Sequence, residues 1–173
     1  MNGLQGITPI RTVCFTGHRP DRLPKDYGQI ELLLDRLTDA IVDAVGRGKD
    51  TFVSGAMSGF DIIAAEQVLM LKKKHPHIKC VIVQPFSYRF FENDNWTEAW
   101  RNKAQAVFAQ ADCHECLAEH YRRGIYFERD RFLVDVASEV IAYWDGGKGG
   151  TKYTVDYALK QGKTVFNISD ELQ

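Results

Sequence analysis

Short apolar runs alternate along the chain with segments whose apolar residues recur at helical spacing. The run over 10–17 is rich in β-branched and aromatic residues and ends in glycine, which is typical of a buried strand. The segment over 27–48 places apolar residues three and four positions apart, which is typical of a helix. The same alternation predicts strands over 10–17, 51–55, 78–86, 112–118, 139–145 and 163–169, and helices over 27–48, 60–75, 96–111, 126–138 and 151–162.

Strand and helix in strict alternation predict βαβ units and a parallel sheet. The predicted strands are apolar without a polar alternation, as expected when helices cover both faces of the sheet. Right-handed crossover connections then restrict the topology. We therefore expect one domain over residues 1–173 with a Rossmann-like, doubly wound three-layer α/β fold and a mainly parallel sheet.

The overall composition is that of an ordinary globular protein, with 45% hydrophobic and 26% charged residues among 173. There is no apolar run long enough to cross a membrane and no basic and apolar N-terminal signal, so we expect a cytoplasmic protein without a membrane partner. The formal net charge of −1 provides no global positive field and argues against nucleic acid as a partner. A homodimer is expected only from the general frequency of such assemblies.

The four cysteines fit a reduced, structural role. Cys14 and Cys80 lie in apolar runs and read as small core residues. Cys113 and Cys116 form a C-x-x-C motif, but a zinc site usually needs a second pair of ligands and no second C-x-x-C is present. We favour packing over a metal or redox site for this pair, and we predict no metal site.

The unusual loops of the chain all begin where a predicted strand ends. The loops are FTGHRPDRLPKDYG, SGAMSGFD, QPFSYRFF and YWDGGKGGT. In an open α/β sheet, ligands bind in the crevice beyond the carboxyl ends of the strands. We therefore expect a binding site at this edge of the sheet.

Residues 146–151, GGKGGT, connect a predicted buried strand to a predicted helix. Gly149 and Gly150 would leave bare backbone N–H groups at the positive end of that helix, with the Thr151 hydroxyl beside them, and this arrangement suits a phosphate. A flexible turn is the alternative, but a turn needs fewer glycines than this segment holds. We interpret the segment as a phosphate-binding loop.

The loop SGAMSGFD allows two interpretations. Ser58 and Asp61 have the spacing of a capping box at the start of a helix. Alternatively, Gly55 and Gly59 let the backbone approach a ligand closely, and Asp61 accepts hydrogen bonds from a ribose. The sequence leaves both open.

The first strand is followed by a long loop that carries His18, Arg19 and Arg22. The planar guanidinium group of arginine suits phosphate recognition. A histidine at a strand end can be a general acid or a polar contact, and the sequence does not separate these roles.

The motifs FTGHRP, SGAMSGFD and GGT together resemble those of the YpsA-like proteins of the SLOG superfamily, which also contains DprA and the Lonely Guy proteins. The resemblance extends over about 11–168. It implies a Rossmann-like fold that binds nucleotides or nucleotide-derived ligands. The ligand-binding residues that it implies are Gly17, His18, Arg19, Pro20, Ser54, Gly55, Gly59, Asp61, Gly149, Gly150 and Thr151.

One departure from the superfamily bears on catalysis. Lonely Guy phosphoribohydrolases carry a P-G-G-x-G-T-x-x-E motif whose glutamate takes part in the reaction, and Thr154 stands at that position here. Asp156, two residues further on, is turned by roughly 200° around a helix. Whether the chain is an enzyme therefore stays open.

We expect the chain to bind a nucleotide-derived small molecule, such as an ADP-ribose-like ligand, as a sensor or regulator that requires no cofactor. The first alternative is a hydrolase of an N-glycosidic or phosphoester bond, with His18 or Asp61 as the acid/base. The second is a scaffold that acts through protein partners.

Overall fold

The structure, a computed structural model, describes residues 2–169; residue 1 and residues 170–173 of the predicted domain lie outside the described residues. Six strands form one sheet in the order β4-β3-β2-β1-β5-β6, and every neighbouring pair is parallel. The strands are β1 Thr12–Gly17, β2 Thr51–Ser54, β3 Lys79–Phe86, β4 Cys113–Ala118, β5 Glu139–Tyr143 and β6 Thr164–Asn167.

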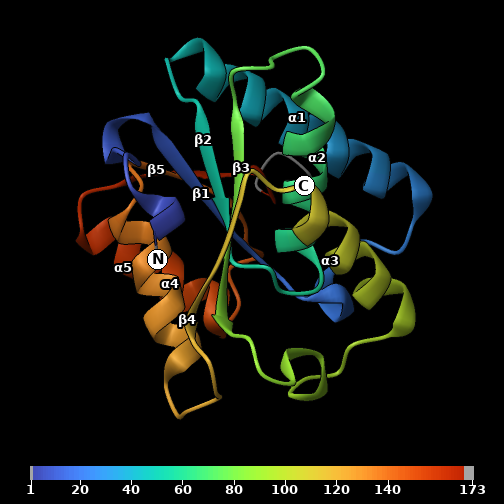
Figure 1. Cartoon of the computed structure of the whole chain (residues 1–173). Coiled ribbons are helices and arrows are strands. Elements are labelled where there is room, and N and C mark those ends of the chain that lie inside the picture. Colours follow the sequence, from blue (N-terminus) through green and yellow to red (C-terminus); the bar gives the residue numbers. More distant parts are fainter. Residues whose placement is uncertain (1, 170–173) are drawn as a thin grey trace.

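Helices cover both faces of this sheet (Figure 1). The α-helices are α1 Tyr27–Gly46, α2 Phe60–Leu71, α3 Glu98–Gln110, α4 Ile125–Asp135 and α5 Gly150–Lys160, with short 3-10 helices at Asn2–Leu4, Pro9–Arg11, Pro20–Arg22 and Phe90–Glu92. Helices α1, α2 and α3 lie on one face, and α4 and α5 lie on the other. The predicted three-layer α/β fold is confirmed. No helix within residues 2–169 is long and apolar enough to cross a bilayer.

Alternate residues of the strands supply two separate cores, because successive strand side chains point to opposite faces. Val13 and Phe15 of β1 pack with the buried faces of α1 and α2. Cys14, between them, packs with Leu133 and Val134 of α4. Both faces of the central strands are therefore dry, which explains why the strands read as continuous apolar runs.

The order of the strands reverses at β1. From β1 the chain passes through α1 to β2 on one side, whereas β5 reaches the other side of β1 through α4 on the opposite face. The carboxyl ends of β1 and β5 therefore diverge into connections on opposite faces, and the crevice between them is where doubly wound folds bind ligands.

The C-x-x-C motif lies on the edge strand β4. Cys113 and Cys116 are an odd number of residues apart on a strand, so their side chains point to opposite faces of the sheet. The Cys116 Sγ lies 3.5 Å from the Gln84 Oε1, and both thiols are free. Burial raises the pKa of both cysteines, which keeps them protonated. In the described part of the chain, no group of three or more His, Cys, Asp or Glu side chains could hold a metal ion.

Candidate functional site

A cavity of about 410 Å³ lies at the β1–β5 crevice. Its walls come from the end of β1 and the following loop, the start of α2, the inner face of α4 and the first turns of α5. Six of the residues expected at the site line this cavity: Gly17, His18, Arg19, Asp61, Gly150 and Thr151. The other five, Pro20, Ser54, Gly55, Gly59 and Gly149, are not among its lining residues.

The N-terminus of α5 opens into the cavity. Gly149 is the N-cap, with a φ of 138° that favours glycine, and no side chain caps this helix end. A Cβ atom at Gly150 would meet no atom within 4 Å, so the space in front of the first turn is open. The Tyr153 N–H makes the first helical bond, to the Gly149 carbonyl, at 3.1 Å. The positive end of the helix dipole therefore faces the cavity, and no protein group within the described residues fills the space in front of it.

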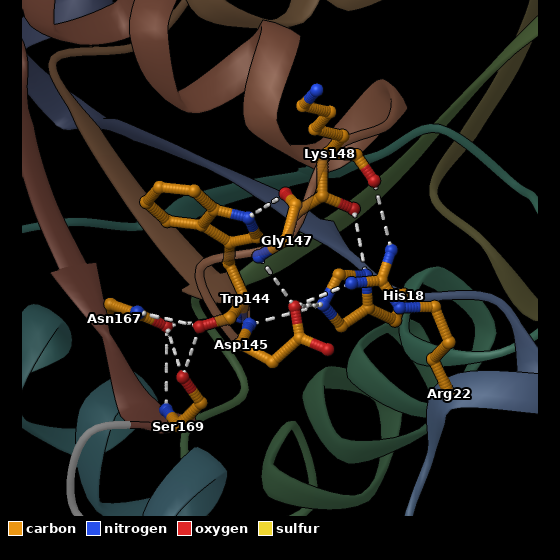
Figure 2. Close-up of polar contacts among 9 residues, drawn as sticks. His18, Arg22, Trp144, Asp145, Gly147, Lys148, Asn167 and Ser169 are labelled. Carbon is orange, nitrogen blue, oxygen red and sulfur yellow. Dashed lines mark hydrogen bonds and ion pairs between the residues drawn. The ribbon is translucent and has the colours of Figure 1, made fainter.

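The first half of the glycine loop is closed by the protein itself (Figure 2). Arg22 donates to the Asp145 carboxylate at 2.5 Å and to the Lys148 carbonyl at 3.1 Å. The same Asp145 oxygen accepts the Gly147 N–H at 2.8 Å, and the Trp144 indole donates to the Gly147 carbonyl at 2.7 Å. A Cβ atom at Gly147 would overlap the Arg22 guanidinium, so this glycine makes room for an arginine.

The Arg22 guanidinium and the Gly147 N–H hold the pKa of Asp145 well below its usual range. Asp145 is therefore ionised at any pH near neutrality and keeps its bonds to both groups. Within the described residues of this segment, Gly150 and Thr151 line the cavity and offer backbone to a ligand.

His18 joins the two strands that flank the crevice. Its ring is only 4% exposed, and Nε2 lies 3.0 Å from the Asp145 backbone nitrogen, whose N–H it accepts. Nδ1 lies 3.5 Å from the Thr151 hydroxyl. Burial, and secondly the nearby Arg22, lower the pKa of His18, which favours a neutral ring. With both nitrogens engaged, His18 is placed as a positioning residue for the first turn of α5.

The glycines of the β2–α2 loop are also in close contact with other segments of the protein. Gly59 has a φ of 97°, and a Cβ atom there would lie 2.5 Å from the His18 carbonyl oxygen. That carbonyl accepts the Phe60 N–H at 3.0 Å. Gly55 packs against the Arg129 guanidinium, which donates to its carbonyl. The N-cap of α2 is Gly59 without a side-chain bond, so the capping box proposed for Ser58 is wrong.

Asp61 is a buried carboxylate on the cavity wall. Its side chain accepts the Met57 N–H at 3.3 Å, and the Ser54 hydroxyl donates to its backbone carbonyl at 2.8 Å. Burial raises the pKa of Asp61 to about 6, although Arg129 opposes this shift. Ala56, next to Met57, has a φ of 69°, which is strained for a residue with a side chain. A strained loop and a carboxylate with a shifted pKa at one cavity wall are features of functional sites.

Helix α4 supplies site residues that the sequence motifs do not contain. Tyr126, Phe127, Arg129 and Asp130 all line the cavity. Arg129 is 4% exposed and its Nε donates to the Asp130 carboxylate at 2.9 Å. A helical pattern alone does not reveal which of its residues will reach a crevice formed by other elements. The only feature of the sequence that could have indicated these residues is the adjacent pair of opposite charges at Arg129 and Asp130.

Two proteins of Bacillus subtilis resemble this chain. The uncharacterized SPbeta prophage-derived protein YoqJ is 28% identical over 138 residues, which cover 74% of this chain and 81% of that protein. The UPF0398 protein YpsA is 23% identical over 158 residues, which cover 88% of this chain and 86% of that protein.

The solved structures that resemble this chain include two forms of DNA processing protein A. The Helicobacter pylori protein, described with a single-stranded DNA binding mode, superposes with a TM-score of 0.62 at 21% identity, over 95% of this chain and 72% of that one. The Streptococcus pneumoniae protein gives a TM-score of 0.58 at 16% identity, over 91% of this chain and 50% of that one. These likenesses establish a shared fold.

The family profile decides the classification. The profile of YpsA, described as the YspA SLOG family, matches residues 13–169, from the first strand of the sheet to the residues that follow the last. That span includes every element that forms the cavity, and the chain belongs to the YspA SLOG family.

Proposed function

We propose that the β1–β5 cavity binds a nucleotide or a nucleotide-derived ligand, with its phosphate at the N-terminus of α5. The observation that carries this proposal is the uncapped and sterically open first turn of α5 at the cavity wall. Helix N-termini bind anions through their free N–H groups and the positive end of the dipole. The Thr151 hydroxyl, held next to His18, adds a donor at the same place.

The charges of the lining fit a ligand that is anionic at one end and polar along its length. Arg19 pairs with Asp94, Arg22 with Asp145 and Arg129 with Asp130, so each cation already has a partner. The phosphate is therefore expected to rely mainly on the backbone of α5 rather than on a free cation. The volume of about 410 Å³ falls within the usual range for small-molecule sites.

Asp61 supports the assignment of a ribose to the opposite wall. A carboxylate is an acceptor for hydroxyl donors, and the two hydroxyls of a ribose would satisfy the lone pairs that the Met57 N–H leaves open. Such bonds would favour the ionised form, so a bound ribose should lower the pKa of Asp61 from about 6.

The test is a thermal-shift panel of AMP, ADP-ribose, NAD and cyclic dinucleotides against the whole protein and two variants. Gly150→Glu places a negative charge in the open space before α5, and Gly150→Gln fills the same space without the charge. We expect a shift with at least one nucleotide that Gly150→Glu abolishes and Gly150→Gln weakens much less. No shift with any nucleotide, or an undiminished shift in Gly150→Glu, would contradict the proposal.

A hydrolase of nucleotides is the second candidate, and Asp61 is the observation that favours it. A carboxyl group whose pKa lies near 6 is suited to give or take a proton at neutral pH. The test is incubation with nucleoside monophosphates, followed by chromatography. Release of base or phosphate that Asp61→Asn abolishes would establish the activity, and its absence across the panel would leave binding alone.

Single-stranded DNA is a third ligand to include in the panel, because the Helicobacter pylori protein with the same fold binds it. The net charge of −1 concerns the whole surface and does not decide what one cavity accepts. If an oligothymidylate binds and AMP displaces it, one nucleotide of the strand occupies the same cavity. If it does not bind, the oligothymidylate is excluded as a ligand of this cavity.

A further inference from the structure

Phe127 is an exposed aromatic ring in the wall of the cavity. It lies in the first turn of α4, it is 46% exposed, and it lines the same cavity as Gly150 and Thr151. Single exposed apolar side chains are common on protein surfaces. This one differs because its exposed ring lines the cavity that holds the first turn of α5.

The Phe127 ring is held in place by α5. The rings of Phe127 and Tyr153 have centroids 4.5 Å apart and an interplanar angle of 62°, which is the favoured edge-to-face arrangement. The Tyr153 hydroxyl in turn accepts a hydrogen bond from Arg131 at 2.6 Å. An aromatic ring that is fixed on one side and exposed on another is a preorganised surface for stacking.

The position of this pair relates it to the proposed phosphate site. Tyr153 lies three residues after Gly150, which is about 4.5 Å along the axis of α5. Phe127, which packs against Tyr153, therefore stands beside the first turn of α5 and lines the same cavity as Gly150. A nucleotide with its phosphate before Gly150 would have the Phe127 ring within the same cavity as an aromatic surface for its base.

We infer that Phe127 is the stacking platform for the base of the ligand, so that the cavity selects nucleotides over sugar phosphates that lack a base. This inference rests on the proposed function and narrows its ligand class. Every nucleobase has an aromatic face, so stacking here selects for the presence of a base more than for its identity.

The experiment compares the binding of AMP and of ribose 5-phosphate by calorimetry. The two probes share the ribose and the phosphate and differ only in the base. We expect the wild-type protein to bind AMP roughly ten-fold more tightly or better, as a stacked base contributes. Phe127→Ala should reduce this preference to roughly three-fold or less while leaving ribose 5-phosphate affinity unchanged, and Phe127→Trp should keep it.

Leu159→Ala is the matched control, because Leu159 is an exposed apolar residue of α5, 58% accessible, that does not line the cavity. It should preserve both affinities. Equal binding of the two probes by the wild-type protein, or an AMP preference that survives in a folded Phe127→Ala variant, would overturn the inference and leave the phosphate site standing. Binding of neither probe, together with no thermal shift for any nucleotide of the panel, would instead overturn the proposed function, and this inference with it.

Discussion

The N-termini of helices α2 and α5 have the same local structure but lie in different surroundings. Both have a glycine N-cap with positive φ, 97° at Gly59 and 138° at Gly149, and neither has a side-chain cap. At α2 the chain itself fills the space, because the His18 carbonyl accepts the Phe60 N–H. At α5 the space before Gly150 is open and borders the cavity.

This difference distinguishes two structural roles that a glycine-rich turn can have. A glycine permits close approach, but the approaching group can be a ligand or another part of the protein. Gly55, Gly59 and Gly147 accommodate Arg129, the His18–Arg19 backbone and Arg22, respectively. Among the glycines of the loops that follow the strands, within the described residues, only Gly150 has neither a neighbour within 4 Å nor a positive φ, so added atoms there would meet a bound ligand and no part of the protein.

The largest expected effect is that of Gly59→Ala. The alanine would adopt an unfavourable φ, and its Cβ would overlap the backbone of His18 and Arg19. We expect the free energy of unfolding to fall by about 4 kcal/mol or more. In Gly150→Ala it should stay level or rise by about 0.5 kcal/mol, because the unfolded chain loses freedom without strain in the fold. Denaturant titration measures both, and similar losses in the two variants would remove the distinction between the closed and the open helix end.

The next effect concerns Asp61, which lies in the first turn of the closed helix and faces the cavity. Its pKa in the fold is about 6, above the ordinary 3.8, so the unfolded state ionises first as the pH rises. Stability contributed by the protonated group is therefore complete below about pH 4 and is lost as the pH rises through about 6.

Asp61→Asn keeps an acceptor for the Met57 N–H and cannot ionise. We expect this variant to be on the order of 2 to 3 kcal/mol more stable than the wild-type protein at pH 7 and about equally stable below pH 4. Chemical denaturation at the two pH values measures the difference. A pH-independent effect would mean that the carboxylate is not destabilised by its burial.

The smallest effect is expected at the closed half of the glycine loop. The Arg22 and Asp145 side chains are 34% and 48% exposed, so Arg22→Ala should cost less than about 1 kcal/mol of global stability. The loop should nevertheless loosen, and the Gly147 amide should exchange its hydrogen faster while the Phe60 amide does not. Arg11→Ala, which breaks an ion pair with Asp50 elsewhere, is the control and should leave the Gly147 exchange rate unchanged.

The fold could be predicted from the sequence because the hydrophobic patterns that identify each strand and helix are local. Each predicted strand and helix is present in the predicted order, and the helix that begins at Gly150 was expected one residue later. Apolar strands without alternation identified a sheet covered on both faces, as the two cores on either side of Val13 and Cys14 confirm.

The candidate site could be predicted only in part from the sequence, because several of its residues reach the cavity through the packing of elements that are far apart in the chain. The loop motifs identified His18, Asp61 and Thr151, which the structure brings to one cavity. They could not show that Gly59 accommodates His18, since that contact joins two loops at a distance set by the sheet. Nor could they place Phe127 and Arg129, whose approach depends on how α4 packs against β1, β3 and α5.

The cavity has walls from opposite ends of the chain, and this has a consequence for synthesis. The His18–Asp145 hydrogen bond spans 127 residues, and β1 pairs with β5 only after that length has been made. At a typical rate of translation, β1 waits on the order of ten seconds with β2 as its sole possible partner. Until Glu139 and the residues after it leave the ribosome, the central strand has an unpaired edge and the wall of the cavity that α5 provides is missing. A molecule that binds this cavity therefore recognises a chain that has been made at least as far as α5, and it cannot assist the folding of a shorter nascent chain.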